Sequence, residues 1–491
     1  MDPHTRMTSG QGWNFDNTYT RLPETFYVRM NPVPVRAPRL LLFNRLLAET
    51  LGLDAEALAG DAGAAIFAGN LLPKGAQPLA QAYAGHQFGH FTMLGDGRAI
   101  LLGEHVTPAG ERFDIQLKGS GQTAFSRSGD GRAALGPMLR EYLVSEAMHA
   151  LGIPTTRSLA VVTTGEEVSR ESALPGAVLT RVAASHLRIG TFQYAAANGD
   201  RQALQALTDY TIARHYPELA TAANPPLALL HAVMERQAAL VARWLHVGFI
   251  HGVMNSDNMA LCGETIDYGP CAFMDAYDPD TVFSSIDQAG RYAYGNQPSI
   301  AHWNLARFAE TLLPLLHAQE KQAIALAEES LGSFTQTFQS FWLSGMRAKL
   351  GLFTQENGDL ELCTALLSCM KESRADYTAT FRHLAEATQA KTTVLADAAC
   401  AQWQSKWQER LARQPQTPQQ VRALMQAHNP VVIARNAFVE AALQAAVERG
   451  DLAPLEKLLA AVSRPYEDGP DQAAFRTPPA PMAGYKTFCG T

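Results

Sequence analysis

The middle of the chain contains polar residues of the kinds that bind a metal ion beside phosphate. The segment from His251 to Asn258 reads HGVMNSDN, and the segment from Ile266 to Gly269 reads IDYG. Mg²⁺ prefers oxygen ligands, keeps several waters, and needs only one or two protein oxygens beside those of a phosphate. Asn258 and Asp267 can supply these oxygens, and Mn²⁺ suits the same ligands. The sequence therefore predicts a Mg²⁺ or Mn²⁺ site.

The order of these residues follows the catalytic loop of kinase-like phosphotransferases, H-x-D-x-x-x-x-N, with a later D-F-G. There the first Asp receives the acceptor's proton, and the Asn and the later Asp bind the metal. Here His251, Asn258 and Asp267 are in register, but Val253 occupies the proton-accepting position. Asp257 adjoins the metal site and is our candidate for the missing base, while His251 is interpreted as orienting the loop. We expect a site that binds nucleotide and uses it differently from a kinase.

A lysine and a glutamate upstream form a second candidate group. Lys118 ends a strand-like run, and Glu141 lies on the helix expected next, as in the lysine–glutamate pair that positions phosphate in kinases. Lys118 also opens the run KGSGQT, in which glycines let backbone N–H groups approach an anion. Glu146 on the same helix is a competing partner, and a solvated surface pair is the alternative interpretation.

Glycine-rich turns and two arginines form the third group. The segments 95–98 and 129–132 both read GDGR; each alone could be a tight turn, but together they flank the lysine strand and suit a nucleotide. Arg181 and Arg188 are predicted to converge on a polyphosphate, because the planar guanidinium matches phosphate oxygens. His86 and His90 have the spacing of metal ligands, but no third ligand is near and the neighbouring glycines oppose a helix. We interpret them as structural.

The composition excludes several classes of function. The 491 residues carry a net charge of −7, with 47% hydrophobic and 18% charged residues, so neither a DNA nor an RNA partner is expected. No apolar run is long enough to span a membrane, and we expect a soluble, cytoplasmic protein without a membrane partner. The six cysteines lack metal-ligand spacing. Five are predicted to be buried thiols, whereas Cys489 lies on the tail, where a thiol is accessible.

The chemistry-bearing residues require elements to position them, and the sequence signals predict an α+β fold. We expect an amphipathic helix over 39–51 and a helix with Pro137 in its first turn that ends before Gly152. We further expect a helix through 241–247, one that begins at Thr417-Pro418 and ends at Asn429, and another that ends at Gly450. Strands are expected at 98–102, 113–118, 158–164 and 177–183, and the proline-rich residues 464–491 are expected to form a docked or loose extended tail.

These motifs together are similar to those of the SelO family, pseudokinase-fold protein adenylyltransferases. The resemblance covers nearly the whole chain and rests on ordered segments: AGHQFGHF, LGDGRA, LKGSGQT, SRSGDGRA, REYLVSEAM, HGVMNSDNM, IDYGP, FMDAY, and late in the chain NP at 429–430 and RN at 435–436. It implies a protein-kinase-like two-lobe fold with an enlarged, mainly helical C-terminal region. The expected parts are an N-terminal extension (1–80), a nucleotide-binding N-lobe (81–195), a C-lobe with the catalytic and metal-binding loops (196–345), and a helical C-terminal region (346–491).

The resemblance also implies an activity and a set of site residues. ATP bound in a flipped orientation would place its α-phosphate at the acceptor, so AMP would pass to Ser, Thr or Tyr hydroxyls of proteins and pyrophosphate would leave. The implied phosphate ligands are Lys118, Arg181 and Arg188, with Glu141 supporting Lys118. Further nucleotide contacts are implied for Gly95, Gly97, Arg98, Asp130, Gly131 and Asp267. Asn258 and Asp267 would bind the metal, and Asp257 would be the catalytic base.

The sequence leaves open a regulatory disulfide and two alternative functions. Some family members are thought to gate activity by a disulfide between a C-terminal cysteine and one near the active site. Cys489 fits the tail position, but the stretch 278–283 lacks a cysteine, and Cys262 or Cys271 would have to substitute. The alternative functions are an atypical kinase that transfers the γ-phosphate, disfavoured by Val253, and a non-catalytic nucleotide-binding scaffold.

Overall fold

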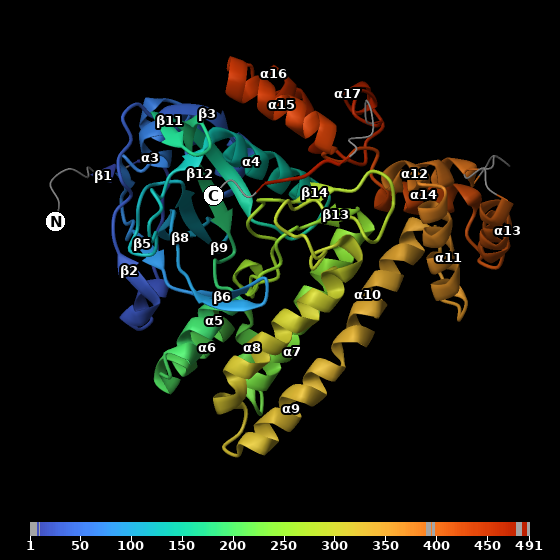
Figure 1. Cartoon of the computed structure of the whole chain (residues 1–491), viewed down its shortest axis with the longest axis horizontal. Coiled ribbons are helices and arrows are strands. Elements are labelled where there is room, and N and C mark those ends of the chain that lie inside the picture. The colour runs from blue at the N-terminus through green and yellow to red at the C-terminus, as the bar shows by residue number, and fades with distance from the viewer. Residues whose placement is uncertain (1–6, 9, 389–393, 395–397, 478–483, 489–491) are drawn as a thin grey trace.

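A large antiparallel sheet dominates the N-terminal half of the computed structural model, which describes residues 7–8, 10–388, 394, 398–477 and 484–488 (Figure 1). The strand order is β2-β5-β8-β9-β12-β11-β3, and β10 also pairs with β12. The strands are β2 (Tyr27–Arg29), β3 (Arg39–Phe43), β5 (Leu79–Gln81), β8 (Ala99–Val106), β9 (Arg112–Lys118), β10 (Ala133–Ala134), β11 (Arg157–Ser169) and β12 (Ala173–Ala183). The four predicted strands are confirmed as β8, β9, β11 and β12.

Helices cover both faces of this sheet. One face packs against the short helices α1 (Arg45–Thr50), α2 (Ala55–Leu58) and α3 (Asp61–Phe67), and the other against α4 (Leu135–Ala150). Ile115 and Leu117 of β9 point toward the short helices. Because successive side chains of a strand alternate between faces, Gln116 and Lys118 point to the opposite side. Helix α4 confirms the prediction of a helix that ends before Gly152.

The prediction of a single helix over 39–51 is wrong in its first half. Arg39–Phe43 forms β3, which pairs antiparallel with β11 at the edge of the sheet, and α1 begins only at Arg45. Asn44 separates the two elements, because its side chain caps the helix by accepting a hydrogen bond from the Leu47 N–H at 3.1 Å. A short apolar run fits helix and strand equally well, and the available partner strand decides between them.

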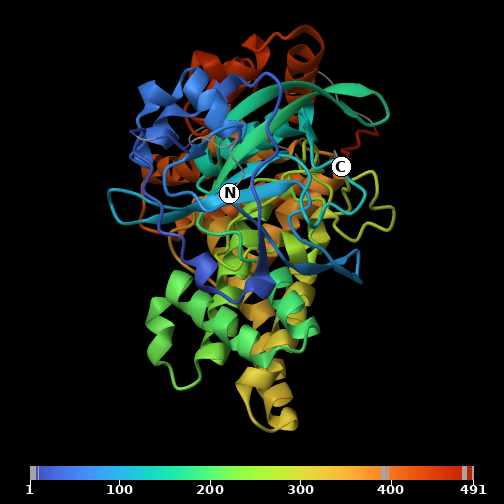
Figure 2. The ribbon, with the colours of Figure 1, turned by 90° about the vertical axis from the view of Figure 1, so that its left-hand side faces the viewer.

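Below the sheet in Figure 1, and again in the side view of Figure 2, lies a group of longer helices. They are α5 (Ile189–Ala197), α6 (Arg201–His215), α7 (Pro225–His246), α8 (Gln297–Leu316), α9 (Glu320–Gly332) and α10 (Phe334–Lys349). The main hydrophobic core runs from α4 and the sheet through α5, α7 and α8. Helix α7 contains the predicted helix through residues 241–246.

The C-terminal part of the chain is mainly helical, as predicted. Its helices are α11 (Asp359–Glu372), α12 (Tyr377–Ala387), α13 (Ala398–Ala412), α14 (Pro418–His428), α15 (Asn436–Arg449), α16 (Ala453–Val462) and α17 (Pro470–Ala473). The predicted ends are confirmed: Thr417 caps α14, whose last residue precedes Asn429, and Gly450 follows α15 with φ +65°. Helices α15 and α16 pack against α4, whereas α11 to α14 form a second core together with the C-terminal ends of α7 and α10.

Three small strand pairs complete the structure, and two of them flank the predicted site. They are β1 (Met7–Thr8) with β4 (Leu72–Pro73), β6 (Ala84–Gln87) with β7 (His90–Met93), and β13 (Phe249–Ile250) with β14 (Ala272–Phe273). The catalytic motif occupies the loop between β13 and β14. Described tail residues 484–488 are docked beside this loop, since Thr487 donates its N–H to the Phe283 carbonyl at 2.8 Å and its hydroxyl to the Pro270 carbonyl at 2.7 Å.

Candidate functional site

A cavity of about 490 Å³ lies between the main sheet, the β6–β7 hairpin and the β13–β14 loop. Most of the residues predicted from sequence line it, although they come from distant parts of the chain. Those that line it are Gly97, Arg98, Lys118, Arg181, Arg188, Asp257, Asn258 and Asp267. A cavity of this size suits a small-molecule ligand of nucleotide dimensions.

Four charged side chains form a connected cluster, and three of them, Lys118, Arg181 and Asp267, line the cavity. Lys118 Nζ donates to Glu141 Oε2 at 2.6 Å and to Asp267 Oδ1 at 2.9 Å. Arg181 Nη1 donates to the same Asp267 oxygen at 2.6 Å and to Glu141 Oε1 at 3.3 Å. Glu141 is therefore the partner of Lys118. The competing Glu146 instead pairs with Arg157, at 2.6 Å.

Arg188 is a buried cation with unused hydrogen-bonding capacity. It precedes α5 directly, its guanidinium lies 4.2 Å from the centroid of the Tyr83 ring, and Nη1 donates to the Asp257 carbonyl at 3.2 Å. Nη2 is buried without a hydrogen-bond partner among the described residues. An unsatisfied buried donor is costly, so an anionic oxygen in this cavity would complete its hydrogen bonding.

Asp267 is held in an unusual backbone conformation, with φ +63°. Burial alone would raise its pKa, but Lys118, Arg181 and Arg188 together hold the pKa of this carboxyl well below its usual range. Oδ1 accepts the hydrogen bonds from Lys118 and Arg181. Oδ2 accepts no hydrogen bond within the described residues and lies 4.0 Å from Arg188 Nη1. The carboxylate thus stays ionised with one oxygen available to a ligand.

The rest of the catalytic loop is fixed by backbone contacts. His251 is buried, and its Nε2 lies 2.9 Å from the carbonyl oxygen of Ile266, the residue before Asp267. Asn258 donates its amide Nδ2 to the Val253 carbonyl at 3.0 Å, which directs the amide oxygen away from that bond. His251 therefore joins the two halves of the motif, in keeping with the orienting role expected for it.

Asp257 lies in the cavity wall as a nearly buried carboxyl group. It is 7% exposed, Oδ1 has no hydrogen-bond partner among the described residues, and burial raises its pKa to about 6. The neighbouring chain makes room for it with glycine, because a Cβ on Gly85 would overlap its carboxylate. A carboxyl group that lines the cavity and has a pKa close to neutrality is suited to accept a proton.

The two glycine-rich turns have different positions. Gly97 and Arg98 line the cavity, whereas Gly95 lies behind them, where it allows close approach of the Phe125 ring. Asp130 and Gly131 do not line the cavity: the Asp130 carboxylate pairs with Arg170 at 2.9 Å, and Gly131 packs on the Gly121 carbonyl. The second turn thus supports the KGSGQT loop from behind.

Tyr83 and Asp96 of the cavity wall, and Gln116 beside it, were not predicted from sequence to be site residues. Tyr83 stacks on Arg188, Gln116 accepts Arg181 Nε at 3.1 Å, and burial raises the pKa of Asp96 to about 6. Two of them had a usable signal. Gln116 lies two residues before Lys118 and shares its face of β9, and Asp96 is the centre of the first GDGR turn. Tyr83 has no local signal.

The remaining cysteine and histidine predictions concern residues outside the cavity. Cys262, Cys271, Cys363, Cys369 and Cys400 are buried, as predicted. Cys489 lies outside the described residues. No group of three or more His, Cys, Asp or Glu side chains suited to a metal occurs in the described part of the chain. His86 is within 2.6 Å of Gln193 Nε2, which agrees with a structural role.

This arrangement of buried cations around an ionised carboxylate is typical of an enzyme that binds a polyphosphate. A family model described as protein adenylyltransferase SelO matches residues 11–463, and the chain belongs to this family. It is 63% identical to the protein nucleotidyltransferase YdiU of Syntrophotalea carbinolica, over 99% of both chains. The proteins of the same name from Brevibacillus brevis and Geobacillus kaustophilus are 62% and 60% identical, the first over 98% of both chains and the second over 98% of this chain and 99% of the relative.

Within the described residues, no helix has both the length and the apolar character needed to cross a membrane.

Proposed function

We propose that this chain has a protein-kinase-like two-lobe architecture and transfers AMP from ATP to Ser, Thr or Tyr hydroxyls of proteins, with release of pyrophosphate. The family and its relatives named protein nucleotidyltransferases support nucleotide transfer. The observation that carries the proposal is the pair Val253 and Asp257. An apolar side chain occupies the kinase base position, while a carboxyl with a pKa of about 6 lines the same cavity four residues later.

The cations of the site fit a triphosphate. Lys118, Arg181 and Arg188 come from three elements and all line the cavity. Glu141 neutralises part of their charge and fixes Lys118. When ATP binds, a phosphate oxygen would accept a hydrogen bond from Arg188 Nη2, which has no partner within the described residues. Gly97 and Arg98 line the cavity next to Lys118, since the Gly119 N–H donates to the Arg98 carbonyl at 2.7 Å, and they would contact the nucleotide there.

The oxygen atoms present also fit a divalent cation. Asp267 and Asn258 line the cavity, and Asp267 Oδ2 with the Asn258 amide oxygen would hold Mg²⁺ or Mn²⁺ beside phosphate oxygens. When bound, the ion would neutralise charge that develops on the phosphates. Lys118 and Arg181 keep Asp267 ionised, so this ligand stays available throughout the physiological pH range.

Asp257 is assigned the role of general base. Its carboxylate would take the proton of the acceptor hydroxyl as that oxygen attacks the α-phosphorus, and the bond to the pyrophosphate oxygen would break. Val253, at the usual base position, offers no proton acceptor. Cys262, Cys363 and Cys369 are buried free thiols, which agrees with a cytoplasmic location, and we include that location in the proposal.

Incubation with Mg²⁺ and ATP labelled on either the α- or the γ-phosphate tests the proposal. We expect protein-bound label from the α-position only, and none with the Asp267→Ala variant. Label from the γ-position only would identify an atypical kinase instead. Tight ATP binding without transfer to a broad panel of proteins would identify a nucleotide-binding scaffold.

A further inference from the structure

The β6–β7 hairpin presents an unpaired strand edge beside the cavity. Strand β7 pairs with β6 from Gln87↔His90 to Ala84↔Met93. Because hydrogen-bonded and non-bonded pairs alternate from the turn, the N–H and C=O groups of Phe91 and Met93 point away from β6. In the described chain nothing bonds to the outward groups of Phe91, and at Met93 only the carbonyl is used, by Arg127 at 2.5 Å. This edge can accept another strand.

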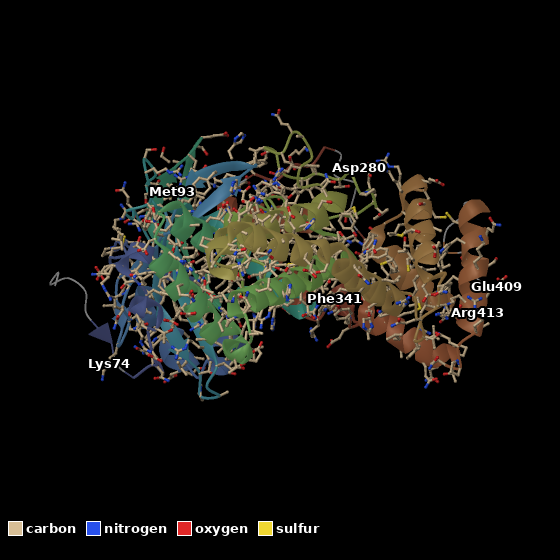
Figure 3. The ribbon with its side chains drawn as sticks, turned by 90° about the horizontal axis from the view of Figure 1, so that it is seen from below. Lys74, Met93, Asp280, Phe341, Glu409 and Arg413 are labelled. Carbon is tan, nitrogen blue, oxygen red and sulfur yellow. The ribbon has the colours of Figure 1, made fainter. Side chains whose placement is uncertain are left out.

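The same edge exposes apolar side chains. Phe91 and Met93 are 46% and 43% exposed and lie on one face of β7, since they are two residues apart. Figure 3 shows Met93 near the outer margin of the molecule. Ile286, 55% exposed, lies on the cavity rim nearby. Natural proteins usually protect free strand edges with charged residues, proline or a covering segment. The exposed edge of β7 is therefore available to a strand from another protein.

The hairpin is fixed to the catalytic loop. The Phe88 N–H donates to Asn255 Oδ1 at 3.0 Å, and the His86 N–H donates to Ser256 Oγ at 2.7 Å. Phe88 adopts φ +51°, which is uncommon for a bulky residue, while its ring packs 5.1 Å from that of Tyr292. Gln87 and Phe88 line the cavity with Asp257. A segment bound along β7 would therefore end beside the proposed base.

Positive charge lies at both ends of this edge. Arg127 binds the Met93 end, and Arg291 lies near the turn, with its guanidinium 4.8 Å from the centroid of the Trp303 ring. Neither arginine forms an ion pair within the described part of the chain. Acidic side chains on a bound strand would supply the missing partners.

We infer that β7 is the docking edge for the acceptor protein, which adds as an extended strand with apolar residues at alternate positions and acidic residues between them. Its main chain pairs with Phe91 and with the Met93 N–H, its apolar side chains pack on those of Phe91 and Met93, and its acidic side chains meet Arg127 and Arg291. The hydroxyl to be modified then follows the strand into the cavity at Asp257. This inference rests on the proposed function.

Peptide binding measured by fluorescence anisotropy tests the edge without any transfer reaction. The probe is a labelled ten-residue peptide of alternating Val and Glu that ends in Gly-Tyr. We expect it to bind the full chain at least about tenfold more tightly than two controls, one with its edge-pairing amides N-methylated and one with Lys in place of Glu. Equal binding of all three peptides would overturn the proposal.

A matched pair of variants locates the binding. Phe91→Ser should weaken binding of the acidic peptide about tenfold, because an aromatic contact is lost. Val28→Ser alters a similarly exposed apolar residue, 40% exposed, on the edge strand β2 of the main sheet, and should leave binding unchanged. Equal effects of the two variants would refute the β7 site. Transfer of α-label to protein is scored separately, so failure of docking and failure of AMP transfer are distinguished.

Discussion

Gly85 of β6 lies in contact with Asp257, so closely that a methyl group on Gly85 would overlap the Asp257 carboxylate. The two residues are far apart in sequence, and the hairpin that carries Gly85 is bonded to the catalytic loop through Ser256. Only glycine permits this approach. The position of the proposed base thus depends on a residue that has no functional group.

Replacement of Gly85 by alanine should displace Asp257 and slow AMP transfer about 100-fold, because a shift of roughly 1 Å at a reacting group has an effect of this size. ATP affinity should stay nearly constant, since the phosphate-binding cations do not contact Gly85. The rate is measured by single-turnover transfer from α-labelled ATP, and affinity by calorimetry. Gly332→Ala is the control, because a Cβ there meets no atom within 4 Å. An unchanged rate for Gly85→Ala would contradict this role.

The transfer rate should rise with pH through about 6 and level off above 7. Burial raises the pKa of Asp257 to about 6, and a general base works only in its deprotonated form. Below pH 6 the rate should fall about tenfold per pH unit. Burial also raises the pKa of Asp96 to about 6, so Asp96→Asn serves to separate the two groups. A profile that is flat from pH 5 to 8 in wild type would exclude Asp257 as the base.

Asp257→Asn should abolish transfer yet stabilise the ATP-free protein at pH 8. The raised pKa means that the folded state binds the proton more tightly than the unfolded state. The free energy of unfolding therefore falls as the pH rises from 3.8, the pKa of Asp257 in the unfolded chain, to about 6, its pKa in the folded protein. Above pH 6 the decrease is complete. The total decrease in the free energy of unfolding is about 3 kcal/mol. Urea unfolding at pH 8 and pH 4 checks this: the advantage of the variant should shrink at pH 4, and an equal advantage at both would contradict it.

Glu141→Gln should destabilise the ATP-free protein by about 3 kcal/mol, because Lys118 and Arg181 lose a buried counterion. ATP should restore part of this stability, since its phosphates can replace the missing negative charge. The expected readout is a larger increase of the melting temperature on addition of ATP than in wild type.

Glu146→Gln is the matched control for that experiment, since Glu146 lies on the same helix and pairs with Arg157, which does not line the cavity. It should also destabilise the protein, but ATP should shift its melting temperature no more than that of wild type. If ATP rescued both variants equally, Glu141 would have no special link to the nucleotide.

Much of the local structure was predictable because its signals are local. Pro137 and Gly152 bracket α4, Thr417 and Gly450 mark helix ends, and the apolar alternation of β9 marks a strand. The error at 39–51 arose where the local signal was ambiguous. There a distant strand, β11, supplied the hydrogen-bonding partner that the sequence could not indicate.

The sequence by itself determined the identity and order of the reactive groups, including the replacement of the usual base by Val253. The tertiary structure alone decided which of them meet. It brought Lys118 to Asp267 across 149 residues, chose Glu141 over Glu146, and placed Asp130 outside the cavity. The physical reason is that caps, turns and periodicity act over a few residues, whereas convergence of charges depends on strand order and on the burial of the main core.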